Sequence, residues 1–150
     1  MESTYEQAVP LSFEKIKTIY HRELGRRVSL ALDAKARRGE WIGQAPTGYR
    51  NVGGRVEIDP VTGPLVAEAF RLAARKRSSL RQILDELTPK GLRSRNGKPM
   101  GPSALAALLQ NPFYVGMIRY KGKLYEGEHE ALVSPSLFDR AGRSLRRRRR

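Results

Sequence analysis

Residues 79–116 read SLRQILDELTPKGLRSRNGKPMGPSALAALLQNPFYVG, and this stretch decides the fold. Its first part predicts a helix, because Ser79 and Gln82 can form a capping box and the apolar residues that follow recur on one helical face. Pro89 and Gly91 end that helix. A second helix is expected from Gly101-Pro102, where proline lacks only an N–H that a first turn does not use, to Asn111-Pro112. The stretch therefore predicts two short helices joined by a basic, glycine-containing connector.

Positive charge is concentrated in two parts of the chain. The 150 residues carry 29 Lys and Arg against 15 Asp and Glu, a formal net charge of +14. Residues 88–124 contain seven cations and no carboxylate, and residues 140–150 contain seven more, again without a carboxylate. Charge localised in this way indicates a polyanionic partner. A helical pair inside an all-positive segment is typical of a module that reads a groove of duplex DNA.

Several classes of protein are excluded by composition. The chain has no cysteine, so it can form neither a disulfide framework nor a thiolate zinc site. No apolar run approaches the ~20 residues that span a bilayer, and Met1 to Val9 do not read as a signal peptide. His129 lies among glutamates, but no second spaced ligand accompanies it, so a structural or surface histidine is favoured over a metal ligand. We expect a soluble intracellular protein with no metal, no cofactor and no membrane partner.

The N-terminal part predicts one long helix. Apolar residues recur every three or four positions between Ser12, a possible N-cap, and Gly39, a possible left-handed C-cap, which gives roughly seven turns. The opposite side is basic, and charge alone leaves two interpretations equally open: a solvated face, or a helix that crosses a phosphate backbone. The cations of this side are Arg22, Arg26, Arg27, Lys35, Arg37 and Arg38.

The remaining elements are short. Hairpins are expected from residues 49–52 and 55–58 around Gly53-Gly54, and from a strand over residues 114–120 that returns over residues 123–125 after Lys121-Gly122. A core helix begins at Asp59-Pro60 or only at Pro64, and a last helix begins at Ser134-Pro135. Trp41 and Tyr49 are interpreted as core anchors. The predicted fold class is α+β, a long N-terminal helix followed by a small helical domain with short β-hairpins, helix-turn-helix-like or winged.

Three segments of the sequence carry a resemblance to a known family. They read S-L-x-x-I-L-x-x-L … G-L … N-G-K … P-S-x-L-x-x-L-L-x-N-P-F-Y-V-G, then G-R-R-V-S-L-A-L-D-A-K-A-R-R-G-E-W-I-G, and G-E-H-E-A-L-V-S-P-S-L-F-D-R. Together they resemble the central "recombinase" DNA-binding domain of large serine recombinases, the phage integrase and transposase group, with the end of the long helix that precedes it. The resemblance covers roughly residues 22–145. It departs at Met100, where the family commonly has tryptophan, and at Gly63, where a non-glycine helix residue is usual.

The resemblance implies a domain organisation and a set of DNA-binding residues. Residues 1–39 would be a loose N-terminus plus the linker helix, residues 40–145 the DNA-binding domain, and residues 146–150 a basic tail. The long helix would cross near the minor groove, and the helix after Gly101 would enter the major groove, where alanine can meet a thymine methyl and Gln110 can pair with adenine. The expected DNA-binding residues are Arg26, Arg27, Lys35, Arg37, Arg38, Arg93, Arg95, Asn96, Lys98, Ser103, Ala107, Gln110, Arg119, Lys121 and Lys123.

The family's catalytic serine belongs to an N-terminal domain that this sequence does not contain, and no serine here has a recognisable nucleophile context. We therefore expect no catalytic site in this chain, which would be the central part of a longer recombinase that binds an attachment half-site, self-associates and acts in the cytoplasm of a bacterial or phage-infected cell. Two other classes stay open. One is a basic RNA- or ribosome-binding protein without preference among duplex sequences. The other is an interaction module in which the long helix is a coiled-coil seam.

Overall fold

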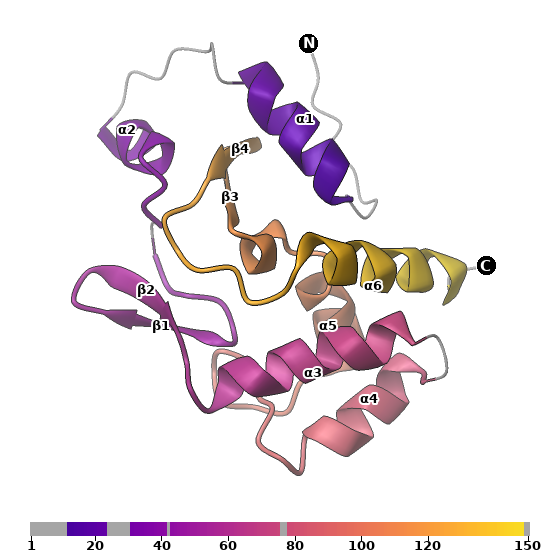
Figure 1. Ribbon diagram of the computed structural model, residues 1–150. Coiled ribbons are helices and arrows are strands. Elements are labelled where there is room, and N and C mark those ends of the chain that lie inside the picture. The colour runs from indigo at the N-terminus through magenta and orange to yellow at the C-terminus, as the bar shows by residue number, and fades with distance from the viewer. Residues whose placement is uncertain (1–11, 24–30, 42, 76–77, 149–150) are drawn as a thin grey trace.

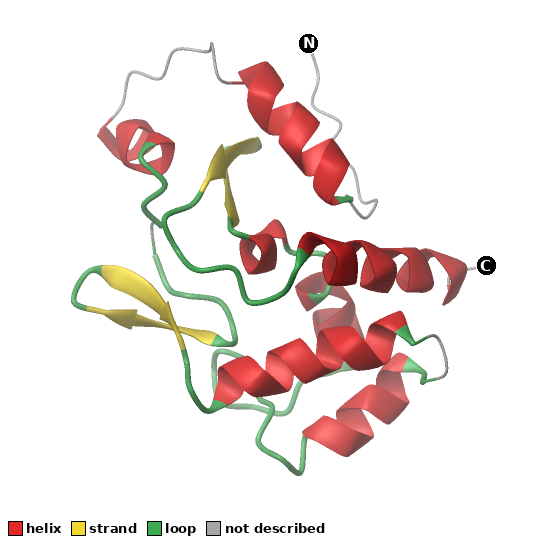
Figure 2. Cartoon of the chain, viewed as in Figure 1, coloured by secondary structure: helices red, strands yellow, loops and turns green. Residues whose placement is uncertain are grey.

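The computed structural model describes residues 12–23, 31–41, 43–75 and 78–148, and it confirms the α+β fold class. Its helices and two separate antiparallel hairpins enclose one apolar core, as Figures 1 and 2 show. The helices are α1 (Phe13–Glu23), α2 (Ala31–Arg37), α3 (Thr62–Ala74), α4 (Leu80–Leu87), α5 (Pro102–Leu108), α6 (Pro135–Arg148) and the 3₁₀ turn η2 (Pro112–Val115). The strands are β1 (Tyr49–Val52), β2 (Arg55–Ile58), β3 (Met117–Tyr120) and β4 (Lys123–Glu126).

The centre of the core is the packing of α3 against α6. Phe70 of α3 lies 5.6 Å from the ring of Tyr114 and 6.1 Å from that of Phe138, and all three side chains are almost fully buried. Aromatic side chains bury large areas, so this cluster fixes the frame on which the other helices pack. Figure 1 shows α3 and α6 side by side, with α4 below α3 and α5 behind them.

The helical pair predicted from residues 79–116 is confirmed. The hydroxyl of Ser79 accepts a hydrogen bond from the backbone N–H of Gln82 at 3.1 Å, and the Gln82 side chain accepts one from the Ser79 N–H at 2.7 Å, which completes the capping box. Helix α5 begins with Pro102 in its first turn and packs against α4. The connector holds a tight turn in which Gly97 has a φ of +81° and the Ser94 N–H donates to the Lys98 carbonyl.

The two hairpins form at their predicted turns, with one correction. Strands β1 and β2 pair around Gly53-Gly54, and β3 and β4 pair around Lys121-Gly122, whose φ angles of +51° and +78° fit a tight hairpin turn. The strand predicted over residues 114–120 starts only at Met117. The reason is that the Asn111 side chain caps η2, and left-handed Gly116 then separates η2 from β3.

The predicted long N-terminal helix is described as two helices, α1 and α2, which contact the same β3–β4 hairpin. The part of the prediction between them, residues 24–30, lies outside the described residues. The expected cap at Ser12 is present, because its hydroxyl accepts from the Lys15 N–H at 3.2 Å. The expected stop at Gly39 is also present, with a φ of +83° and a hydrogen bond from the Glu40 N–H back to the Lys35 carbonyl.

Gly63 explains how α3 begins. Helix α3 starts at Thr62, between the two alternatives that the sequence left open, and the Asp59 carboxylate accepts from the N–H groups of Val61 and Thr62. These bonds hold the pKa of Asp59 below its usual value. A Cβ on Gly63 would lie 2.7 Å from Cγ2 of Ile58, so glycine lets β2 approach the first turn of α3. This departure from the family pattern therefore has a local packing reason.

Helix α6 is longer than the sequence predicted. It runs through Arg148, so residues 146–148, which the sequence assigned to a tail, form its last turn, and residues 149–150 lie outside the described residues. Ser144 and Leu145 are both almost fully buried, which anchors the helix just before the run of arginines. Arginine is itself a good helix former, so the helix has no local reason to stop at Leu145.

Candidate nucleic-acid interface

An open groove of about 400 Å³ runs along the exposed side of α5. On α5 it is lined by the small exposed side chains of Ala104 and Ala107 and by the buried Leu108. One wall is the segment of residues 41–47, of which residue 42 lies outside the described residues, and the other is the turn that carries Ser94 and Arg95. Among the residues that the structure describes, no carboxylate lines this groove. A neighbouring hollow of about 390 Å³ extends the groove toward Arg50, Arg93 and Asp59. The residues that line both are Gln44, Pro46, Thr47, Ser94 and Arg95.

The segment of residues 41–47 is held by side chains rather than by secondary structure. The indole N–H of Trp41 donates to the Gln44 carbonyl at 2.8 Å, and its ring meets Phe113 edge-on at 5.1 Å. The Asn51 side chain accepts from the Ala45 N–H and donates to the Gly43 carbonyl. Trp41 is therefore an anchor, as predicted, and the segment is a positioned wall of the groove.

Tyr49 and Tyr114 complete this anchoring. The Tyr49 hydroxyl donates to the Glu130 carbonyl at 2.6 Å, and the Tyr114 hydroxyl donates to the Thr47 carbonyl at 2.5 Å. Both rings are buried, and this burial raises the pKa of each phenol above its ordinary value. Both tyrosines therefore stay neutral hydrogen-bond donors.

The predicted DNA-binding residues of the connector divide into two kinds. Arg93 is half-buried, and its guanidinium donates to the carbonyls of Thr88 and Leu92, so it closes the carboxyl end of α4. Arg95 is exposed in the groove and lies 3.5 Å from the Gln44 carbonyl. Asn96 and Lys98 are exposed at the same turn. The structure therefore places three of these four side chains where a bound polyanion could reach them.

At α5 the structure changes the set of residues that could contact base edges. Ser103 and Ala107 are exposed, as predicted. Gln110 lies just beyond the end of α5 and is half-buried, and its amide donates to the Ala106 carbonyl of that helix at 3.0 Å. Ala104, which sequence reasoning missed, is exposed and lines the groove. Its position three residues before Ala107 was the signal that could have found it, because residues at i and i+3 share a helix face.

The cations of the second hairpin belong to another part of the surface. Arg119, Lys121 and Lys123 lie on β3, β4 and their turn, and this hairpin packs against α1, α2 and η2. Figure 1 shows the hairpin near α1 and α2, on the opposite side of α6 from α3 and α4. The predicted set is therefore not brought together into one continuous site.

The cations of α2 are described only in part. Arg37 and Arg38 are exposed and Lys35 is half-buried, whereas Arg26 and Arg27 lie outside the described residues. The guanidinium of Arg38 makes a 2.9 Å hydrogen-bonded ion pair with Glu40, which raises the pKa of the arginine and lowers that of the glutamate. Arg37 has no such ion pair within the part of the chain that the structure describes.

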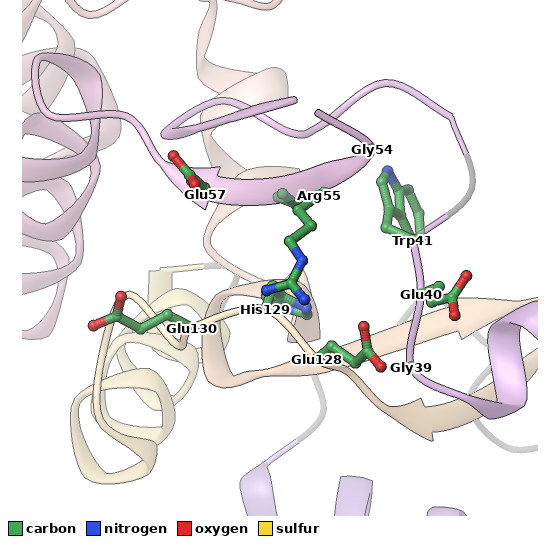
Figure 3. A pocket seen from close by; sticks show the side chains of 10 residues that line it. Gly39, Glu40, Trp41, Gly54, Arg55, Glu57, Glu128, His129 and Glu130 are labelled. Atoms are coloured by element: carbon green, nitrogen blue, oxygen red, sulfur yellow. The ribbon is translucent and has the colours of Figure 1, made fainter. Parts of the chain in front are cut away.

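A further hollow of about 280 Å³, distinct from the two beside α5, lies near β2, and its lining is acidic. Figure 3 shows that Arg55 extends from β2 toward His129, with glutamates around the pair. The His129 ring stacks on Phe113 at 3.7 Å, and Nε2 lies 2.6 Å from the Phe113 carbonyl, so Nε2 carries a proton and donates. Burial lowers the pKa of His129. The carboxylates that line the hollow are those of Glu40, Glu57, Glu128 and Glu130. The hollow would therefore repel a phosphate backbone.

None of the helices among the described residues is both long and apolar enough to cross a lipid bilayer. No group of three or more His, Asp or Glu side chains among them converges on a point where a metal ion could bind.

The model of the family described as Recombinase matches residues 60–148, which is more than half of the chain. Comparison with the curated proteins found no match. Among solved structures, one described as "Crystal Structure of a LSR-DNA Complex" superposes with a TM-score of 0.63 at 18% identity. It covers 77% of this chain and 37% of that one.

A second solved structure, described as "Sequence Requirements of the Listeria innocua prophage attP site", superposes with a TM-score of 0.62, also at 18% identity. It covers 77% of this chain and 49% of that one. The chain thus spans less than half the length of either solved structure, and at this identity the likeness concerns the fold. Together with the family match, it leads to one assignment: the chain belongs to the Recombinase family and has the fold of the recombinase domain of large serine recombinases.

Proposed function

We propose that this chain binds duplex DNA through the groove along α5 and recognises one half of an attachment site for a large serine recombinase. The observation that carries the proposal is the composition of the groove: small exposed side chains on a helix, Arg95 beside them, and no carboxylate in the lining. Small residues on the exposed face of α5 allow close approach to base edges, and arginine can hold phosphate or guanine.

The groove residues and the exposed residues beside them have two expected roles. Ser103, Ala104 and Ala107 would lie against base edges and determine sequence preference, whereas Arg95 and Lys98 would hold the phosphates on either side. The cations of α2 and of the β3–β4 hairpin would hold more distant phosphates. In the whole recombinase, DNA cutting and rejoining would belong to a serine-bearing catalytic domain outside this sequence.

The similarity of this chain to the solved structures and to the Recombinase family also supports DNA binding. One solved structure of this fold is described as a complex with DNA, and the other concerns the sequence of a prophage attP site. The family match over residues 60–148 supports carrying DNA binding over to this chain. The self-association expected of the whole recombinase remains part of the proposal.

Selection from a random duplex library tests the proposal. Purified chain should enrich one sequence motif, and a duplex with that motif should bind at least about 10³-fold more tightly than bulk DNA at physiological salt. Equal binding of all duplexes would remove half-site recognition from the proposal. Tighter binding to structured RNA than to any duplex would favour the RNA-binding alternative.

Two variants distinguish a residue that recognises bases from a residue that binds phosphate. Replacing Ser103 should relax the sequence preference at one position, because a base-edge contact is lost. Replacing Arg37 should weaken binding to all duplexes alike and reduce the salt slope by about 1. If both variants changed affinity and preference in the same way, the assignment of roles to α5 and α2 would be wrong.

A further inference from the structure

We propose that the exposed face of α6 is a second phosphate-binding surface, separate from the groove along α5. This inference rests on the proposed DNA binding and extends it to α6, of which the sequence assigned only the last turn, residues 146–148, to a basic tail. The surface consists of Arg140, Arg143, Arg146 and Arg147, which are all exposed.

Helix α6 is divided sharply into two faces. Phe138, Ala141, Ser144 and Leu145 are almost fully buried, and α6 packs against α3, α1 and η2. At 100° per residue the four arginines fall on the opposite half of the helix. No ion pair involves any of the four among the residues that the structure describes, in contrast with Arg71 and Lys90, which pair with Glu68 and Glu86.

The acidic residue of α6 does not neutralise this face. Asp139 lies on the exposed half of the helix by its position, but its carboxylate accepts a hydrogen bond from the Phe13 N–H at the start of α1, 2.5 Å away. The carboxylate is thus engaged in joining α1 to α6. The four guanidinium groups therefore face solvent without an acidic partner on their own helix.

Helix stability alone does not account for the arginines. Cations near a helix carboxyl terminus interact favourably with the helix dipole. This interaction is enough to explain the presence of Arg146 and Arg147 in the last turn. Arg140 and Arg143 lie in the middle of α6, where that effect has faded. Like charges three and four residues apart destabilise an isolated helix, and this face contains several such pairs. A bound polyanion would offset that repulsion.

The spacing of the charges favours a nucleic-acid backbone over an acidic protein. Arg140 to Arg147 span about 10 Å of helix axis. Duplex DNA presents a negative charge every ~1.7 Å along its axis, and guanidinium groups bind phosphate oxygens in a bidentate way. Four arginines on such a short length match that charge density.

The α6 surface lies apart from the α5 groove. No residue of α6 lines either of the two hollows beside α5. Figure 1 shows that the carboxyl end of α6 points away from the body of the molecule, on the side opposite the β1–β2 hairpin. The phosphates that it meets would belong either to the flank of the duplex bound at α5 or to a second duplex.

Salt dependence of binding tests the proposal, with any mixed-sequence duplex as the probe. The variant R140Q/R143Q should reduce the slope of log affinity against log salt by about 2, since each lost phosphate contact contributes about 0.9. The control R71Q/K90Q removes the same net charge from exposed cations paired with glutamates, and it should leave the slope nearly unchanged. Equal slopes in the two variants would overturn the proposal.

Two further variants keep the test independent of folding. R140K/R143K retains both charges and should retain the wild-type slope. Circular dichroism should show the same helix content in all variants, because the replaced side chains are exposed. If the lysine variant showed the same reduced slope as the glutamine variant, the arginines would have a structural role, and this outcome would also overturn the proposal.

Duplex length distinguishes the two sources of phosphate. On a duplex of about one helical turn, ~10 base pairs, a flank contact is impossible, so the difference between wild type and R140Q/R143Q should vanish if α6 holds the flank. If α6 holds a second duplex, the difference should persist, and wild type should bind two duplexes per chain in analytical ultracentrifugation.

Failure of this inference can be told from failure of the proposed function. If wild type binds duplexes and selects a motif but the α6 variants behave like the control, only the α6 surface is refuted. If wild type binds no duplex at low ionic strength, both proposals fail.

Discussion

The hydroxyl of Tyr114 donates a hydrogen bond to the carbonyl oxygen of Thr47, 2.5 Å away across 67 positions of the sequence. Through this bond the aromatic core, in which Tyr114 packs against Phe70, holds the segment that walls the groove along α5. The shape of the candidate DNA-binding surface therefore depends directly on this hydrogen bond from the core.

We expect Tyr114→Phe to loosen this wall. The substitution keeps the ring but leaves the Thr47 carbonyl without its donor, which should lower the free energy of unfolding by about 1–3 kcal/mol. Urea denaturation measures this change, and duplex binding should weaken in parallel. The control is Tyr120→Phe, whose half-buried ring makes a cation–π contact with Lys121 at 5.4 Å. Equal effects of the two variants would contradict the role given to the Tyr114 hydroxyl.

Replacing Gly39, which follows α2 and lies against the backbone of residues 126–128, should lower the free energy of unfolding. Its φ is +83°, and a Cβ there would lie 2.6 Å from the Glu126 carbonyl oxygen and 2.9 Å from the Glu128 nitrogen. Gly54 has nearly the same φ, +81°, but a Cβ there would meet nothing within 4 Å. Gly54→Ala should therefore cost only the left-handed strain, about 1–2 kcal/mol.

Gly39→Ala should cost clearly more than Gly54→Ala, because the clash with backbone atoms adds to the same strain. The glycine pair is matched in conformation, so the difference between their unfolding free energies in urea isolates the close approach. A difference of zero would mean that α2 can move away from β4 without loss.

Ala107→Glu should abolish tight DNA binding without harm to the fold. Ala107 is exposed on the floor of a groove with no carboxylate, so the new charge would face the phosphates and bases of the duplex. Opposed like charges at an interface cost several kcal/mol, a loss of affinity of roughly a hundredfold. Fluorescence anisotropy measures it.

Val52→Glu is the matched control for that charge change. Val52 is 42% exposed at the tip of the first hairpin and lines neither hollow beside α5. It should reduce affinity only slightly, through net charge. Comparable losses in both variants would show that duplex binding does not use α5.

His129 should make stability depend on pH. Burial lowers its pKa in the folded chain, so between that value and the unfolded value of ~6.5 the unfolded state binds more protons. Stability should therefore be complete above about pH 6.5 and decrease as pH falls toward the lowered pKa. Urea denaturation at a series of pH values should show this decrease in wild type.

His129→Gln should flatten the pH dependence, because the titrating group is gone while the other ionisable groups remain. The difference between the two curves isolates His129 from groups such as Asp59, whose lowered pKa affects stability only in more acidic solution. Parallel curves for wild type and variant would contradict the prediction.

The local elements of this protein were predictable from its sequence. The Ser79–Gln82 capping box, the glycine pair at residues 53–54, and the Ser134 cap, which accepts from the Leu137 N–H, each depend on residues close in the chain. The localised positive charge and the family's spaced motifs likewise lie in the sequence itself, so the family assignment could be made from it and was confirmed by the family match.

Tertiary structure decided what the cations and the groove do. The sequence cannot show that Arg93 closes α4 while Arg95 faces a groove, because that depends on where the Thr88 and Gln44 carbonyls lie in space. It cannot show that residues 41–47 wall α5, since the bond from Tyr114 to Thr47 joins distant positions. Nor did it predict that α6 continues through the arginines, because burial of Leu145 against the core is a long-range interaction. Local chemistry fixed the helices and turns, and long-range packing fixed the surfaces they expose.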